Sequence, residues 1–177
     1  MSDSGNTTGT SGARGVRRRR GHVSGAGPPR ALTTAELPDH VGQLLGTSED
    51  HRLGQDLVDA FARVTGDDQW IHVDPERARP VGGTIVHGHL LLSLIPVMST
   101  EAFTVTDALR TVNHGLDGVR FRAPVPTGEG VRGHFRLTGA RPRARTWYEL
   151  VLGVDIHLLD GPLVCRATQT YVCALRT

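Results

Sequence analysis

Residues 90–98 read LLLSLIPVM, and this run decides the fold class. It follows His87 and Gly88 and is apolar on every side of a helix, a pattern typical of a helix enclosed by other elements. Asp160 and Gly161 form a hairpin signal between two segments with strand character. The sequence therefore predicts an α+β domain in which an antiparallel sheet curls around one apolar helix. The expected strands cover residues 116–121, 131–137, 146–158 and 163–175.

Upstream of this run, apolar residues recur at helical spacing and predict a helix over 55–65. Gly66 is expected to end that helix, because glycine tolerates the left-handed conformation of a helix terminus. Residues 67–80 are then expected to form a loop. Nearer the N-terminus, 31–46 is interpreted as a linker or short helix and 48–53 as a short strand.

The charge of the 177 residues is unevenly distributed and indicates two regions. Residues 1–30 contain six arginines and one acid, and they are rich in Gly, Ser and Thr. Such a composition cannot bury enough apolar surface to offset the entropy of ordering, so we expect a disordered basic tail. Residues 31–177 carry fourteen arginines and seventeen acids and are long enough for a single domain. The arginines at 17–20 are not followed by an apolar stretch, so we expect a cytoplasmic protein.

Composition also excludes several function classes. All twenty basic residues are arginine, so Schiff-base chemistry and a Walker-type phosphate loop, which both need lysine, are excluded. Aromatic residues are only 5% of the chain, which argues against a stacking surface for nucleic acid. No apolar run approaches the ~18 residues of a membrane span. The two cysteines are too few for a disulfide framework.

The segment with the clearest chemistry is 61–75, which reads FARVTGDDQWIHVDP. Asp67 and His72 are five residues apart and would point about 140° apart on a continuous helix. If Gly66 ends the helix, the loop can fold back and the two side chains can converge. An acid and an imidazole that share one water form a general acid/base pair. The alternative is that both are ordinary surface residues of a loop.

This segment resembles the signature of the MaoC-like dehydratases, the (R)-specific enoyl-CoA hydratases of the hot-dog fold. Gln69 and Trp70 stand where that family usually has Asn-Pro, a variant similar to the NodN-like branch. Two further segments match in order, IVHG at 85–88 and VRFRAPV at 119–125. The likeness extends over roughly residues 45–175 and implies a hot-dog fold.

The resemblance implies that Asp67 and His72 are catalytic and add water reversibly across the 2,3-double bond of a trans-2-enoyl thioester. It also implies that the N–H of Gly88 polarises the thioester carbonyl, a role that a helix N-terminus suits. The alternative for Gly88 is that it only permits close packing between helix and sheet. The sequence does not assign acid and base roles within the pair.

Four further residues are expected to contact substrate: Trp70, Ile71, His87 and Asn113. Trp70 either packs beneath the catalytic loop or walls off the acyl tunnel, and we favour packing. His87 either lines the pocket or hydrogen-bonds the loop. No metal site is expected, because His87 and His89 are two residues apart and point in different directions at a helix start.

The predicted function is therefore (R)-specific hydration of an enoyl thioester carried on coenzyme A or acyl carrier protein, without a cofactor or metal. Two alternatives remain open, an acyl thioesterase of the same fold and a non-catalytic hot-dog module that binds acyl groups or a partner. A sheet with an exposed edge strand is expected to pair with a second copy, which predicts a homodimer with two equivalent sites. No nucleic acid or membrane partner is expected.

Overall fold

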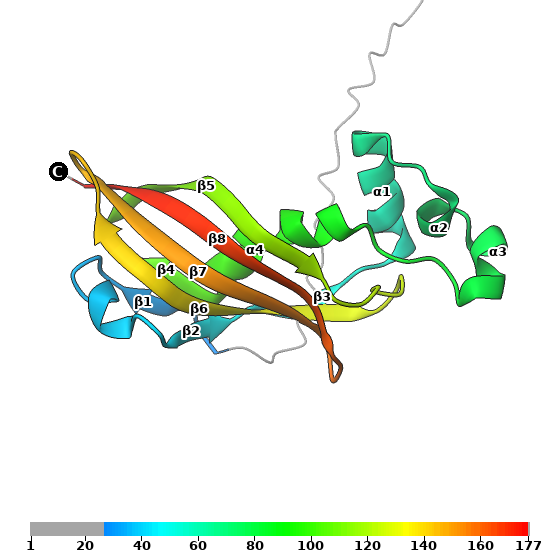
Figure 1. Cartoon of the computed structure of the whole chain (residues 1–177), viewed down its shortest axis with the longest axis horizontal. Coiled ribbons are helices and arrows are strands. Elements are labelled where there is room, and N and C mark those ends of the chain that lie inside the picture. The colour runs from blue at the N-terminus through cyan, green and yellow to red at the C-terminus, as the bar shows by residue number, and fades with distance from the viewer. Residues whose placement is uncertain (1–26, 177) are drawn as a thin grey trace, which may run out of the picture.

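A computed structural model describes residues 27–176 of the chain (Figure 1). Residues 1–26 of the expected basic tail lie outside the described part. Arg30, which was assigned to that tail, instead begins strand β1 (Arg30–Leu32) and pairs with Phe103. The domain therefore begins at least one residue earlier than predicted.

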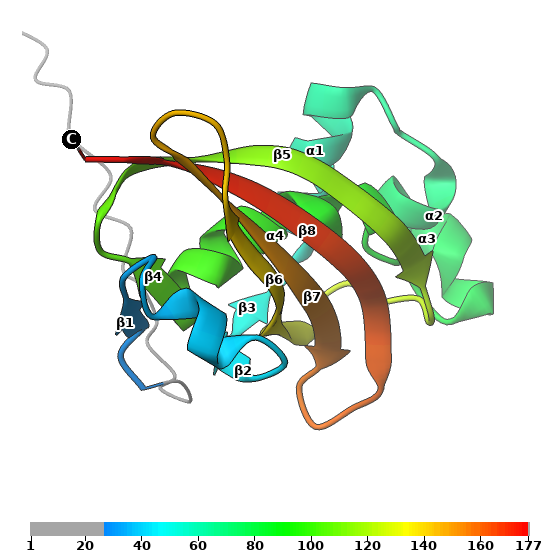
Figure 2. The ribbon, with the colours of Figure 1, turned by 60° about the vertical axis from the view of Figure 1, so that its left-hand side comes forward.

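The apolar run forms helix α4 (Gly88–Ala102), which is longer than the run itself. Ile95 and Met98 are almost fully buried against the sheet. Ser93 and Val97 are exposed, so the expectation of a helix enclosed on every side is wrong for the single chain. The reason is that the sheet curls around one side of α4 and leaves a stripe open (Figure 2). Among residues 27–176, no helix is long and apolar enough to cross a membrane.

The antiparallel sheet confirms the predicted α+β architecture. Its strand order is β2-β6-β7-β8-β5, and β3 pairs with β6 beside β2. Alternate residues of the long strands face α4, as Phe135 on β6 and Tyr171 on β8 illustrate. The strands are β2 (Leu44–Thr47), β3 (His51–Arg52), β5 (Ala108–Phe121), β6 (Gly130–Pro142), β7 (Trp147–Leu158) and β8 (Leu163–Leu175).

The segment before β3 is more ordered than a linker. Strand β1 pairs in parallel with β4 (Phe103–Val105), and a single 3-10 turn, η1 (Leu37–His40), precedes β2. The sparse apolar residues of this segment are the buried ones, with Leu37 fully inaccessible. The interpretation of 31–46 as a linker or short helix is therefore confirmed only for η1, which Leu37 anchors. The strands at either end, anchored by Leu32 on β1 and Leu45 on β2, were not predicted.

Helix α1 (Gln55–Thr65) has the predicted bounds and ends at Gly66, whose φ is +78°. The following segment is not a simple loop. It contains two single-turn helices, α2 (Trp70–Val73) and α3 (Pro75–Ala78), and a 3-10 turn, η2 (Arg79–Val81). In Figure 1 the helices α1, α2 and α3 gather at one end of the molecule, next to the start of α4. This arrangement places residues 67–74 beside the first turn of the central helix.

Strand β5 begins eight residues before its predicted start at 116. Its first half was missed because most of its side chains are exposed and show no alternation of apolar and polar residues. Within the described residues, β5 pairs only with β8, so its other side is a free edge. Four large apolar side chains are exposed along it: Leu109, Val112, Leu116 and Phe121.

Candidate active site

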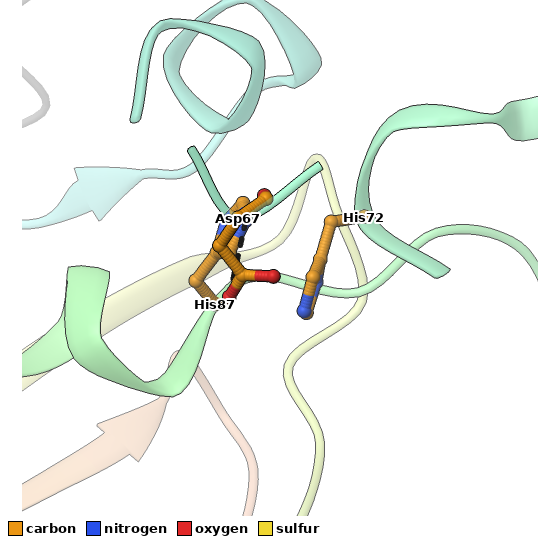
Figure 3. Close-up of side chains that lie close together, drawn as sticks. All are labelled: Asp67, His72 and His87. Carbon is orange, nitrogen blue, oxygen red and sulfur yellow. Dashed lines mark hydrogen bonds and ion pairs between the residues drawn. The ribbon is translucent and has the colours of Figure 1, made fainter. Parts of the chain in front are cut away.

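Asp67 and His72 come together at the end of the molecule where α1, α2 and α4 meet. The left-handed residue Gly66 ends α1 and turns the chain, so Asp67 leaves the helix direction. His72 lies on α2, and the Asp67 carboxylate points toward its ring (Figure 3). Side-chain nitrogen and oxygen atoms of Asp67, His72 and His87 lie within 4.8 Å of one another. The structure thus brings together the two residues that the sequence pattern paired.

The imidazole of His72 is oriented by a backbone carbonyl. Its Nδ1 lies 2.7 Å from the carbonyl oxygen of Ile85. Because a carbonyl oxygen only accepts hydrogen bonds, Nδ1 carries the proton and Nε2 keeps a free lone pair in the neutral ring. His72 is 8% exposed, so its ring is held inside the protein. Nε2 is consequently the atom of His72 that is available to accept a proton.

Three hydrogen bonds fix α2 to the segment that precedes α4. The N–H of Ile85 donates to the carbonyl of Ile71 at 2.9 Å. Gln55 donates from its side-chain amide to the carbonyl of His72 at 2.7 Å, and Thr84 donates to the amide oxygen of Gln55 at 2.7 Å. Sequence reasoning missed Gln55 and Thr84, since neither belongs to a pattern that distinguishes it from an ordinary polar residue.

His87 occupies the N-cap position of α4 and is 2% exposed. Its Nε2 donates a hydrogen bond to the main-chain carbonyl of Asp67 at 2.9 Å. Its ring stacks on His72, with centroids 3.8 Å apart and planes inclined by 25°. Of the two predicted roles for His87, bonding to the loop is therefore confirmed, and His87 does not line the cavity described next.

An open cavity of about 380 Å³ adjoins His72 and the first turn of α4. One wall is the segment after β5, which sequence reasoning matched to the family without assigning it to the site. Arg122 contributes the one guanidinium among its lining residues. The lining comprises His72, Ile85, Val86, Gly88, His89, Leu91, Phe121, Arg122, Ala123, Pro124 and Val125.

The other predicted substrate contacts are not in this cavity. On the single turn of α2, residues two apart point about 200° apart, so Trp70 faces away from the side of His72. Trp70 is half-buried, and the guanidinium of Arg77 lies 4.9 Å from its ring centroid. Ile71 contributes its backbone carbonyl to the Ile85 hydrogen bond instead of lining the cavity.

Asn113 lies in a different cavity, of about 360 Å³, which Ser99 and Tyr171 also line. Ser99 follows Gly88 by three helical turns, about 16 Å along α4. Within one chain, Asn113 is therefore at the opposite end of the central helix from His72. The sequence around Asn113 does not show how β5 aligns with its neighbouring strand, so the position of Asn113 could not be predicted.

Gly88 is the first residue of α4, and its N–H makes no hydrogen bond to any residue of the described part. A Cβ placed on Gly88 would lie 2.8 Å from the tip of the Phe121 ring. Close packing alone therefore requires a small residue here. The same glycine leaves a free N–H at the positive end of the helix, and Gly88 is one of the residues that line the cavity beside His72.

The stacked rings of His72 and His87 do not have the arrangement of two ligands on one metal ion. The lone pair of an imidazole nitrogen lies in the ring plane, so two stacked rings with centroids 3.8 Å apart direct their lone pairs side by side. His87 Nε2 and His72 Nδ1 also already donate to carbonyl oxygens. Each of these hydrogen bonds leaves the other nitrogen of the ring unused, so it is the stacking of the rings that disfavours a shared ion.

The two cysteines lie on β8 and face the core. Both Cys165 and Cys173 are buried and free, as expected from their separation along one strand. Burial raises the pKa of the Cys165 thiol to about 11. Neither thiol borders the cavity beside His72, so the site offers no cysteine nucleophile.

Comparison with known proteins identifies the family. The MaoC like domain matches residues 36–153, which is most of the described chain. The chain belongs to the MaoC-like domain family. Nodulation protein N from Rhizobium leguminosarum bv. viciae is 42% identical over 132 residues, covering 70% of this chain and 82% of that protein. This relative confirms the predicted NodN-like resemblance.

Other MaoC-like relatives carry enzymatic names. The 3-hydroxyacyl-thioester dehydratase Z from Mycobacterium tuberculosis is 44% identical over 109 residues, covering 60% of this chain and 72% of that protein. The solved R-hydratase PhaJ1 from Pseudomonas aeruginosa superposes with a TM-score of 0.67 at 20% identity, over 82% of this chain and 87% of that chain. The R-hydratase from A. caviae gives a TM-score of 0.62 at 26% identity, over 74% and 94% of the two chains. These likenesses confirm the hot-dog fold.

The contact between Gly88 and Phe121 predicts a mild effect of Gly88→Ala on stability. The clashing atom is the far end of a ring that is 47% exposed, so the ring can swing into the cavity. We expect the free energy of unfolding to fall by about 1 kcal/mol or less, against about 3 kcal/mol or more for Gly46→Ala. The difference arises because a Cβ on Gly46 would meet the main-chain oxygen of Ala102 at 2.3 Å.

Chemical denaturation of both variants tests this expectation, and a crystal structure of Gly88→Ala should show the Phe121 ring displaced. Equal losses in the two glycine variants would contradict it, because they would mean that the Phe121 ring is as immobile as backbone.

Proposed function

We propose that this MaoC-like protein hydrates trans-2-enoyl thioesters reversibly to (R)-3-hydroxyacyl thioesters. The observation that carries the proposal is the convergence of the Asp67 carboxylate with the imidazole of His72, whose Nε2 carries no proton and which lines an open cavity. Membership in the MaoC-like family and the names of its dehydratase and R-hydratase relatives support the same reaction class.

In this proposal the pair activates one water. An ionised carboxylate and a neutral imidazole nitrogen are both hydrogen-bond acceptors, and a water molecule has two hydrogens to donate. A water that donates to both Asp67 and His72 directs its oxygen lone pairs outward, toward C3 of the substrate. The pair accepts a proton as the oxygen–carbon bond forms, and it returns a proton to C2.

The thioester carbonyl is proposed to meet the free N–H of Gly88. As water adds to C3, electrons from the double bond move to C2 and negative charge develops on the thioester oxygen. A backbone donor at the positive end of α4 stabilises that charge more than it stabilises the neutral carbonyl. Glycine allows this approach, because it has no side chain between the helix N-terminus and the cavity.

The substrate is proposed to be carried by coenzyme A or acyl carrier protein, with no additional cofactor and no metal. Arg122 provides a positive charge at the cavity for a carrier phosphate. Trp70 is assigned a packing role, supported by its stacking with Arg77 away from the cavity. The cytoplasmic location expected from the sequence stays a prediction.

Crotonyl-CoA hydration is the direct test of this function. We expect the wild-type protein to consume the enoyl absorbance and release (R)-3-hydroxybutyryl-CoA. Asp67→Asn should lower kcat/KM on the order of 10²-fold, because an amide cannot accept a proton from water. Asp68→Asn is the matched control, since Asp68 is the neighbouring exposed acid and does not belong to the convergent group.

The same assay separates the alternatives. Release of free thiol without loss of the double bond would identify a thioesterase and contradict the hydration proposal. Binding of crotonyl-CoA with no turnover would identify a non-catalytic acyl-binding module. Full activity of Asp67→Asn would refute the proposed role of the pair.

We also propose that the protein is a homodimer with two equivalent sites, formed through the free edge of β5. That edge exposes four large apolar side chains along a long strand, and unpaired edge strands readily pair with another chain. Two copies related by a two-fold axis would cover both edges at once.

Light scattering at micromolar concentration should therefore give twice the chain mass of 19.1 kDa. Val112→Asp, which places a charge on the β5 edge, should shift the mass to that of one chain. Val64→Asp is the control, because Val64 is 86% exposed at the end of α1, away from this edge. A monomeric wild-type protein would contradict the proposal.

A further inference from the structure

His87 is a buried titratable residue that the proposed mechanism does not use. We propose that His87 is a positioning residue that holds Asp67 and His72 in the one arrangement able to bind the attacking water. This inference rests on the proposed function and deepens it. His87 itself touches neither the cavity nor the substrate in this account, and it acts through the two residues that do.

The first half of the role is to hold the backbone of Asp67. The hydrogen bond from His87 Nε2 reaches the carbonyl of Asp67, and the N–H of Asp67 donates to the side chain of Thr65 at 3.3 Å. Asp67 is otherwise on an exposed turn, and its side chain is 56% exposed. The bond from His87 is therefore the contact that ties this turn to the protein interior. The Asp67 carboxylate lies 4.0 Å from the same Nε2.

The second half of the role is to fix the ring plane of His72. A single hydrogen bond from Nδ1 to Ile85 sets one direction but leaves the ring free to tilt about it. The face of His87 removes that freedom by stacking at 3.8 Å. His87 is itself backed by Phe61, whose ring centroid lies 5.1 Å away. The Phe61 ring is inclined by 53° to the His87 ring, so Phe61 on α1 packs against the pair of stacked imidazoles without extending the stack.

Stability alone does not account for an imidazole at this position. His87 Nδ1 is buried and has no hydrogen-bond partner among the described residues. A buried polar atom without a partner destabilises a fold, whereas an apolar ring of similar shape would fill the same space without that penalty. The imidazole is explained by what it does with its other nitrogen, which is to donate to the carbonyl of Asp67.

His87→Phe separates this role from a packing role. The variant keeps an aromatic ring against His72 and removes only the donor to Asp67. We expect kcat for crotonyl-CoA hydration to fall about 10-fold or more, since displacing a reacting group by about an ångström is enough for such losses. KM should stay within about twofold, because the cavity contacts are untouched. The melting temperature should stay equal or rise.

His134→Phe is the matched control. His134 is a partly buried histidine on the outer face of β6, next to His157 and remote from α2. Its replacement should leave kcat and KM unchanged. His87→Gln, which restores a side-chain N–H donor, should recover part of the activity lost in His87→Phe.

An unchanged kcat in His87→Phe, or a loss of activity that simply follows a loss of melting temperature, would overturn the inference.

Nitrogen-15 NMR of the histidine rings provides a readout that does not need turnover. The wild-type spectrum should show His72 protonated at Nδ1 in one sharp environment, and His87→Leu should broaden or split it. An unchanged His72 signal would overturn the stacking half of the role. If the wild-type protein does not hydrate crotonyl-CoA, the proposed function fails while this spectrum still tests His87.

Discussion

The site depends on a short segment, residues 84–87, that is hydrogen-bonded on both sides. On one side, Ile85 exchanges two hydrogen bonds with α2, one from its own N–H to Ile71 and one from the His72 ring to its carbonyl. On the other side, the N–H of Val86 donates to the carbonyl of Val125 at 2.8 Å. This segment leads directly into α4, and Val125 belongs to the connection between β5 and β6, so the helix and that connection together hold the loop that carries the proposed catalytic pair. The position of the His72 imidazole is therefore a consequence of the fold.

The hydrogen bonds of the two histidine rings decide which groups of the site remain as hydrogen-bond acceptors. Both buried histidines donate one proton to a main-chain carbonyl, His72 through Nδ1 and His87 through Nε2. Carbonyl partners fix the tautomer without introducing a second charge, so His72 presents a lone pair and Asp67 a carboxylate. Two acceptors facing one another suit a water molecule, which donates two hydrogens. In the proposed mechanism, the free N–H of Gly88, which lines the same cavity, is the hydrogen-bond donor for the developing enolate.

The parts of the fold that the sequence predicted are those with a strong local signal. Residues 90–98 predicted α4, because a run of nine residues in which only Ser93 is polar is typical of a helix in the core. Gly66 predicted the end of α1, because glycine tolerates the left-handed conformation found there. The first half of β5 was not predictable, because an edge strand carries exposed polar side chains without alternation. Helices α2 and α3 were not predictable either, because a helix of one turn is too short to show a helical repeat of apolar residues.

The candidate site was predicted to a similar degree. Asp67 and His72 were identified, and the motif matched to the family supplied their proposed role. None of the four expected substrate contacts lines the cavity beside His72, and their contact with substrate stays a prediction. The turn of α2 directs Trp70 away from His72, Ile71 and His87 hydrogen-bond main-chain groups, and Asn113 lies at the far end of α4. Contacts such as that between Gln55 and Thr84 join residues 29 positions apart, and no local pattern encodes them.

The central claim is that Asp67 and His72 act as one unit on one water. A double-mutant cycle measures this directly, with kcat/KM for crotonyl-CoA hydration determined for Asp67→Asn, His72→Asn and the double variant. The account predicts that the double variant loses roughly as much activity as the more damaged single variant, because either change alone disables the shared step. Losses that multiply would show that the two residues act independently, and an active His72→Asn variant would contradict the account outright.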